Sequence, residues 1–116
     1  MRKIMGILLA VLVMLTTSAM AYTAYSLRGD GLNMYVRDGG NSIQSQGSYM
    51  GISWNYNGVS TQDTAVTLKF VTPATVQVGR TRTIKTITVT YQKNTQKVSI
   101  TGTGINYLNI PVVNLR

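Results

Sequence analysis

A two-residue alternation of apolar and polar side chains over residues 84–101 constrains the fold of this chain more than any other feature. Because successive side chains of a strand point to opposite faces, such alternation predicts strands with one apolar face. The positions on that face are Ile87, Val89, Tyr91, Val98 and Ile100. These positions are odd-numbered before a polar break and even-numbered after it. Because directly opposed residues of a hairpin lie on the same face, an odd-numbered residue must pair with an even-numbered one, and the loop around Gln92 to Gln96 must contain two or four residues. Within the loop, Asn94 is the residue best suited to a left-handed conformation.

The rest of the chain after residue 21 repeats this pattern at short intervals. Alternating runs separated by glycine and asparagine every 8–12 residues or so are typical of an all-β sandwich or barrel. The other expected inward positions are Met34, Val36, Met50, Ile52, Trp54, Tyr56, Val66, Leu68, Phe70, Val76, Val78, Leu108, Ile110 and Val112. We expect Pro73 to end one strand and Pro111 to mark an edge strand or a strand end. No segment after residue 21 keeps a helical period, so no helix is expected there.

Part of the second half of the chain resembles a known module. The residues that carry the resemblance are Phe70, Pro73, Gly79, the Ile87/Val89 strand and the closing Val98-Ser-Ile-Thr-Gly-Thr-Gly104. They are similar to the second half of ASPM/SPD-2/Hydin-type immunoglobulin-like modules. The resemblance implies a binding or structural module with no catalytic residues to carry over. We therefore predict an all-β fold, a small immunoglobulin-like antiparallel β-sandwich after an N-terminal signal helix.

The first 21 residues have the three-part pattern of an export signal. A basic start is followed by an apolar run from Ile4 to Leu15 and by Ala19-Met20-Ala21, as a signal peptidase requires. The apolar run is well short of the roughly 20 residues needed to span a membrane. We expect cleavage near Ala21/Tyr22 and a single domain over residues 22–116. The mature chain would have no transmembrane anchor and would be secreted or periplasmic.

Composition narrows the chemistry of this domain. The sequence has no histidine, cysteine or glutamate, and its acidic residues are Asp30, Asp38 and Asp63. A Ser-His-Asp or Cys-His site and a zinc site with nitrogen or sulfur ligands therefore cannot be built. We expect a protein that is not an enzyme and that needs no metal and no cofactor. Losing Arg2 and Lys3 leaves nine basic residues and a net charge of +6, which favours an anionic partner.

Three surfaces are candidates for binding. The first is a basic patch for an anionic ligand, made by Arg80, Arg82, Lys93 and Lys97. The second is an aromatic platform made by Tyr35, Tyr49, Trp54 and Tyr56, although Trp54 has the parity of a core residue. The third is a threonine-rich face made by Thr86, Thr88, Thr90, Ser99 and Thr101, a composition that also suits any exposed strand.

These observations favour an exported, non-catalytic structural or binding module at the cell surface or in the periplasm. Its partner would be a protein or an anionic envelope polymer. One alternative is a subunit of a pilus or surface filament assembled by strand exchange through Tyr22 to Leu27 or Leu108 to Val113. Self-assembly would then use Leu108, Ile110 and Val112. Another alternative is a secreted basic effector or inhibitor that binds an anionic target.

Overall fold

The computed structural model describes residues 22–40 and 42–116, so the predicted signal at 1–21 lies outside the described residues. The described residues form ten strands and no helix, which confirms the all-β prediction. The strands are β1 (Thr23–Gly29), β2 (Leu32–Asp38), β3 (Ile43–Tyr49), β4 (Ile52–Gly58), β5 (Gln62–Asp63), β6 (Thr67–Val78), β7 (Thr81–Gln92), β8 (Lys97–Gly102), β9 (Ile105–Pro111) and β10 (Val113–Asn114).

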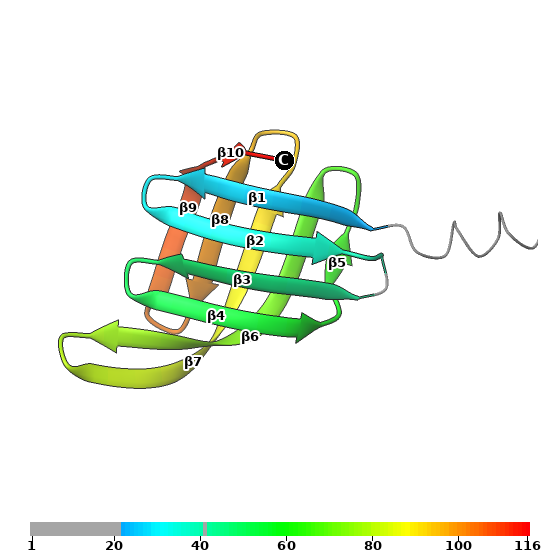
Figure 1. Cartoon of the computed structure of the whole chain (residues 1–116). Coiled ribbons are helices and arrows are strands. Elements are labelled where there is room, and N and C mark those ends of the chain that lie inside the picture. Colours follow the sequence, from blue (N-terminus) through cyan, green and yellow to red (C-terminus); the bar gives the residue numbers. More distant parts are fainter. Residues whose placement is uncertain (1–21, 41) are drawn as a thin grey trace, which may run out of the picture.

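The strands belong to one antiparallel sheet that turns back on itself. Their order is β10-β1-β2-β3-β4-β6-β7-β8-β9, with β5 beside β6. Figure 1 shows β1 to β4 as one layer, with β6 to β9 crossing behind it. The chain then returns to its start, where Leu27 pairs with Asn114 and Arg28 with Val113. A further bond from the amide of Leu115 to the carbonyl of Ser26, at 2.8 Å, helps to close the sheet almost into a barrel.

The predicted immunoglobulin-like sandwich is not the arrangement observed. An immunoglobulin sandwich consists of two separate sheets joined by Greek-key crossovers. Here neighbours in the main path of the sheet are also neighbours along the chain, apart from β5 and the closing pair. Two-residue turns are one reason. Asp30 and Gly31, and likewise Met50 and Gly51, have positive φ angles, which is the geometry of a tight hairpin turn.

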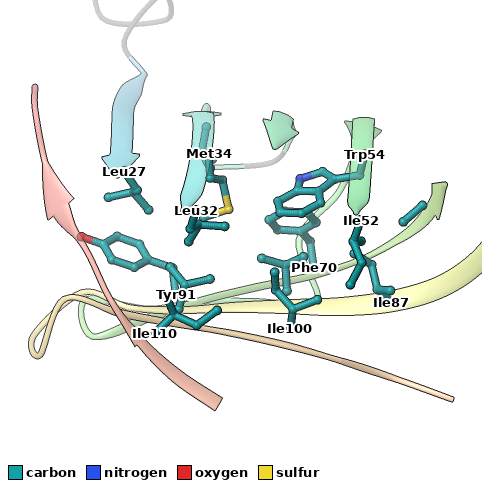
Figure 2. Packing of buried hydrophobic residues seen from close by; sticks show 14 of the residues in the cluster. Leu27, Leu32, Met34, Ile52, Trp54, Phe70, Ile87, Tyr91, Ile100 and Ile110 are labelled. Atoms are coloured by element: carbon teal, nitrogen blue, oxygen red, sulfur yellow. The ribbon is translucent and has the colours of Figure 1, made fainter. Parts of the chain in front are cut away.

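The core lies between the two layers (Figure 2) and is built from the inward positions of every long strand. Most of the apolar residues expected to point inward are buried there. Four expected core positions are exposed. Met50 lies in the β3–β4 turn and Val66 precedes β6, so the core-facing part of the strand does not reach them, and their side chains are 67% and 48% exposed. Val78, 74% exposed, has the inward parity but lies at the end of β6, beyond the residues that pair with β4, and Leu108 is turned outward by a bulge in β9.

The β7–β8 hairpin confirms the expected register. Tyr91 pairs with Val98 and Val89 with Ile100, and the strands are joined by a four-residue loop at 93–96. The left-handed residue is Gln96, with a φ of 55°, and not Asn94. Placing the left-handed residue last lets the loop lead directly into β8.

Pro73 does not end its strand, because β6 continues to Val78. The carbonyl of Lys69 and the amide of Gln77 both bond to segments other than β7. Backbone groups of alternate residues point to the same side of a strand, so the nitrogen of Pro73 also points away from β7. It falls between the short pairings of β6 with β5 and with β4. The missing N–H therefore removes no ladder bond.

Strand β9 contains a bulge that changes its inward positions. Opposite β8, the register shifts between the partners of Val98 and Ile100, and Asn109 has a φ of 57°. The extra residue turns Leu108 outward, with 57% of its side chain exposed, whereas Ile110 and Val112 stay buried. The prediction that Leu108 shares a face with these two residues was wrong.

Candidate functional site

The four basic residues predicted to form a patch lie in two separate places. Arg80 and Arg82 are exposed at the β6–β7 turn, whereas Lys93 and Lys97 flank the β7–β8 loop. The two pairs lie at opposite ends of β7, a strand of 12 residues. At about 3.3 Å per residue, such a strand is roughly 40 Å long. The fold therefore does not bring the four together, and anion binding by either pair stays a prediction.

The outer face of β2, β3 and β4 carries a regular array of polar side chains. Strand register aligns them in three rows across the sheet. The rows are Asn33, Ser48 and Ser53; Tyr35, Gln46 and Asn55; and Arg37, Gln44 and Asn57. We call these nine residues the polar face. They alternate with core residues along each strand, because the two-residue turn between β3 and β4 and the longer β2–β3 turn keep the register.

Three shallow hollows lie side by side over the polar face. The first, about 310 Å³, is lined by Tyr35, Arg37 and the amides next to them. The second, about 260 Å³, extends past Arg37 to Tyr22. The third, about 350 Å³, continues from Tyr35 to Asn33 and Ser48. Together they form a shallow strip that is open to solvent and crosses the three strands.

The hydrogen-bonding groups of the polar face are free to meet a ligand. Among the described residues, no side chain of the nine forms a hydrogen bond with another protein group. Five of the nine are asparagine or glutamine, whose amide group presents a donor and an acceptor together. None is a carboxylate. The face can therefore donate and accept hydrogen bonds and does not repel an anion.

Two arginines place positive charge next to aromatic rings at this face. The guanidinium of Arg37 lies 4.1 Å from the centroid of the Tyr22 ring. That of Arg116, at the C-terminal end, lies 5.8 Å from the centroid of the Tyr35 ring. The C-terminal segment reaches this place because the side chain of Asn114 accepts a hydrogen bond from the amide of Ser26, at 3.1 Å. The closing strand thus supplies a cation beside the central tyrosine.

The aromatic platform predicted from sequence is divided by the sheet. Trp54 is a core residue, 5% exposed, and its indole Nε1 donates a 3.0 Å hydrogen bond to Ser45 Oγ. Tyr56 stacks on Phe70 with centroids 5.6 Å apart. Only Tyr35 lies on the outer face. The predicted threonine face does form, since Thr88 pairs with Thr101 and Thr90 with Ser99 on the outside of β7 and β8.

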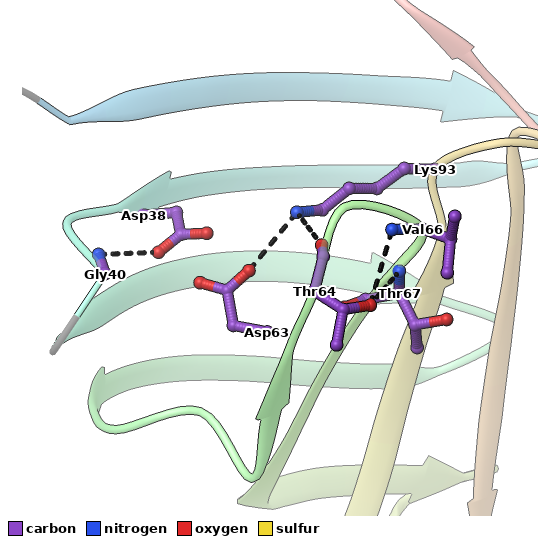
Figure 3. Close-up of polar contacts among 7 residues, drawn as sticks. All are labelled: Asp38, Gly40, Asp63, Thr64, Val66, Thr67 and Lys93. Atoms are coloured by element: carbon purple, nitrogen blue, oxygen red, sulfur yellow. Dashed lines mark hydrogen bonds and ion pairs between the residues drawn. The ribbon is translucent and has the colours of Figure 1, made fainter.

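A separate cluster of charged groups lies at one end of the barrel (Figure 3). The Lys93 ammonium contacts Asp63 Oδ1 at 3.2 Å and donates to the carbonyl of Thr64 at 2.8 Å. Asp38 accepts a 2.9 Å hydrogen bond from the amide of Gly40. A hollow of about 400 Å³ adjoins these groups. The contacts of Lys93 tie β5 and the residue after it to the β7–β8 loop, and the Asp38–Gly40 bond closes the β2–β3 turn on itself.

Burial and neighbouring charge perturb this cluster. Burial, with a hydrogen bond to the Asp63 carboxyl, raises the pKa of Asp38 above its usual value. Burial lowers the pKa of Lys93, but the hydrogen bond to Asp63 and the nearby Tyr25 outweigh it and raise the pKa overall. Burial also raises the pKa of Tyr91, helped by Tyr25. Because Lys93 forms an ion pair with Asp63 and Asp38 accepts a hydrogen bond from the Gly40 amide, we interpret the cluster as a structural element and not as a binding site.

Sequence reasoning did not identify the polar face as a site. No strand had been predicted over 43–49, where the structure has β3, so Gln44, Gln46 and Ser48 had been assigned to no face. The signal was present in the alternation of β3 and β4, where every outward residue is polar and uncharged. Combining that alternation with the turn at Met50-Gly51 would have placed Gln46 beside Asn55.

Residues 22–40 and 42–116 contain no group of three or more acidic, histidine or cysteine side chains arranged to hold a metal ion. Within the same residues, no helix is long and apolar enough to cross a membrane. The resemblance to immunoglobulin-like modules stays a prediction. Comparison of the chain with models of known protein families, with curated proteins and with solved structures finds no match.

Proposed function

We propose that this chain is an exported, non-catalytic binding module that holds an anionic polysaccharide of the cell envelope on its polar face. The observation that carries the proposal is the array of nine outward polar side chains, which include no carboxylate and form no side-chain hydrogen bond within the described part of the chain. A polysaccharide offers a long row of hydroxyl groups, which amide side chains can recognise by donating and accepting at once.

Tyr35 is the central residue of the proposed site. It lies in the middle row of the polar face, between the first and third hollows. A tyrosine ring presents a flat apolar surface with a polar end, which suits the C–H face of a sugar ring. The guanidinium groups of Arg37 and Arg116 approach aromatic rings on the same side of the sheet. They would pair with the carboxylates of an acidic sugar by charge-assisted hydrogen bonds.

Filament assembly by strand exchange, one alternative considered from sequence, receives less support. It would use the two terminal segments, but β1 already pairs with β2 along its whole length. The C-terminal β10 already pairs with β1, and Ile110 and Val112 are buried. Donating either segment to a neighbour would first require opening the barrel.

The test measures polysaccharide affinity of residues 22–116 by affinity electrophoresis, with polygalacturonate or alginate in the gel as anionic probes and dextran as the neutral probe. We expect the anionic polymers to retard the protein and dextran to have little effect. Tyr35→Ala should weaken binding about tenfold or more, as expected for a central aromatic contact. Arg37→Gln should weaken binding and reduce its salt dependence.

Matched controls lie on the opposite outer face. Thr88→Ala and Thr101→Ala change half-buried neighbours on the outer face of β7 and β8 and should leave the affinity unchanged. Lys69→Gln removes the same charge as Arg37→Gln from β6, away from the polar face. If the anionic polymers do not retard the protein, or if Lys69→Gln acts as strongly as Arg37→Gln, the proposed site is incorrect.

A further inference from the structure

The far end of the β6–β7 hairpin projects beyond the barrel (Figure 1). β4 pairs with β6 only at Ser53–Thr75 and Ile52–Val76. We call residues 77–84 the hairpin tip. Residues 77–82 pair only with each other, and Thr83 and Ile84 pair with Val76 and Thr75 of β6. One bond, from the Gln77 amide to the carbonyl of Gly51 at 2.9 Å, anchors the base of the tip. Three residues from Val76 to the turn span about 10 Å.

Exposed apolar and basic side chains gather at the hairpin tip. Val78 is 74% exposed and Ile84 is 72% exposed, and Met50, in the turn beside the tip, is 67% exposed. These are the three most exposed large apolar side chains among the described residues. Arg80 and Arg82 are exposed between Val78 and Ile84, and the tip contains no acidic residue. Neither arginine forms an ion pair within the described part of the chain.

The apolar side chains are on both faces of the tip. Val78 has the parity of buried Val76, whereas Ile84 pairs with Thr75 on the other face. A flat protein partner would cover one face and leave the other apolar side chain in water. A lipid interface surrounds an inserted hairpin and can take up both.

We propose that the hairpin tip binds the surface of an anionic phospholipid membrane. The guanidinium groups of Arg80 and Arg82 would pair with lipid phosphates, for which arginine is well suited. Val78, Ile84 and Met50 would enter the boundary between headgroups and acyl chains. That boundary admits apolar groups to a depth of about 5–10 Å, close to the length of the tip. The proposal uses residues outside the polar face and does not depend on polysaccharide binding.

A soluble polyanion is the competing partner. It would also be attracted to Arg80 and Arg82, but it would gain nothing from Val78 and Ile84. The two partners therefore differ in their response to replacement of the apolar side chains.

The experiment is flotation of residues 22–116, which contain every described strand, with vesicles of phosphatidylcholine alone or mixed with phosphatidylglycerol. We expect flotation with the mixed vesicles and little with phosphatidylcholine. The double variant Arg80→Gln/Arg82→Gln should partition about 30-fold more weakly, from about fivefold per basic residue at an anionic surface. Val78→Ser/Ile84→Ser should lose about tenfold or more. Lys69→Gln/Lys97→Gln removes the same charge elsewhere and should change partitioning much less.

Each other outcome overturns the proposal. Without flotation on phosphatidylglycerol vesicles, the tip is not a membrane-binding element. If only the arginine variant loses binding and the Val78→Ser/Ile84→Ser variant does not, the partner is a polyanion and not a lipid surface. Equal losses in the arginine and lysine variants would mean that net charge, and not the tip, drives binding. Near-native fluorescence of the single tryptophan shows in each case that the variant is folded.

Discussion

Gly47 is a position where a single added methyl group should strongly destabilise this fold. Its missing side chain would point inward, under the indole ring of Trp54. A Cβ atom at residue 47 would lie 2.6 Å from both Cε2 and Cη2 of that ring, and closer still to Cζ2. These atoms belong to a rigid ring, and the indole is held by its hydrogen bond to buried Ser45. Gly47→Ala can therefore be accommodated only if the indole moves.

The expected cost follows from three contributions. Overpacking a core costs about 1–3 kcal/mol. Moving the indole also breaks the bond to Ser45 Oγ, and a buried polar group left unpaired costs about 1–3 kcal/mol. Alanine in place of glycine returns about 0.4–1 kcal/mol by restricting the unfolded chain. Gly47→Ala should therefore lower the free energy of unfolding by about 2–4 kcal/mol, or the midpoint of thermal unfolding by on the order of 10–20 °C.

The assay is denaturation followed by circular dichroism and by fluorescence of Trp54, the single tryptophan of the chain. Emission of the folded variant should differ from that of the wild type because the indole is displaced. Ser48→Ala, at the exposed neighbouring position, should change stability by less than about 0.5 kcal/mol. In a Trp54→Leu background the ring is gone, and Gly47→Ala should cost little or even stabilise. An equal cost in both backgrounds would refute the packing argument.

Three further perturbations test other parts of the fold. Folding raises the pKa of Asp38. The contribution of its protonated carboxyl group to folding stability is therefore complete below the unfolded-state pKa of about 3.8, and it is lost as the pH rises through the folded-state pKa. Asp38→Asn keeps an oxygen for the Gly40 amide and should make the protein more stable than wild type at pH 7 but not at pH 3, as urea titrations would show. Asn114→Ala removes the acceptor for the Ser26 amide and should cost about 1 kcal/mol, with faster amide exchange at Ser26 than in the wild type. Pro73→Ala should destabilise by less than about 1 kcal/mol; clear stabilisation in thermal melts would mean that the new N–H has found a ladder partner.

The sequence predicted the pairing of β7 with β8 because both strands alternate without interruption and each has one apolar face. A slip of one residue there would expose Val89 and Tyr91, so the alternation alone specified the register. The same reasoning failed at β9. Ile105 and Ile110 are both buried although their numbers differ in parity, which requires an inserted residue between them. Asn109 provides it, and a search for a parity conflict next to an asparagine could have found the bulge.

The overall topology could not be predicted in the same way, because local alternation does not say whether a sheet ends or closes. Closure depends on two pairs between β1 and β10 and on the absence of a side chain at Gly29, where a Cβ would overlap the backbone at Pro111. These contacts join residues about as far apart in the chain as the domain allows.

The polar face was missed for a related reason, because its rows join outward residues from three different strands. Each row has ordinary solvent-exposed residues when its members are taken singly. Only the register between β2, β3 and β4 turns them into a surface with repeated amide groups. A ligand that is itself periodic, such as a polysaccharide, is the partner for which this repetition matters. Moving the array out of register should therefore weaken binding more than removing any single amide.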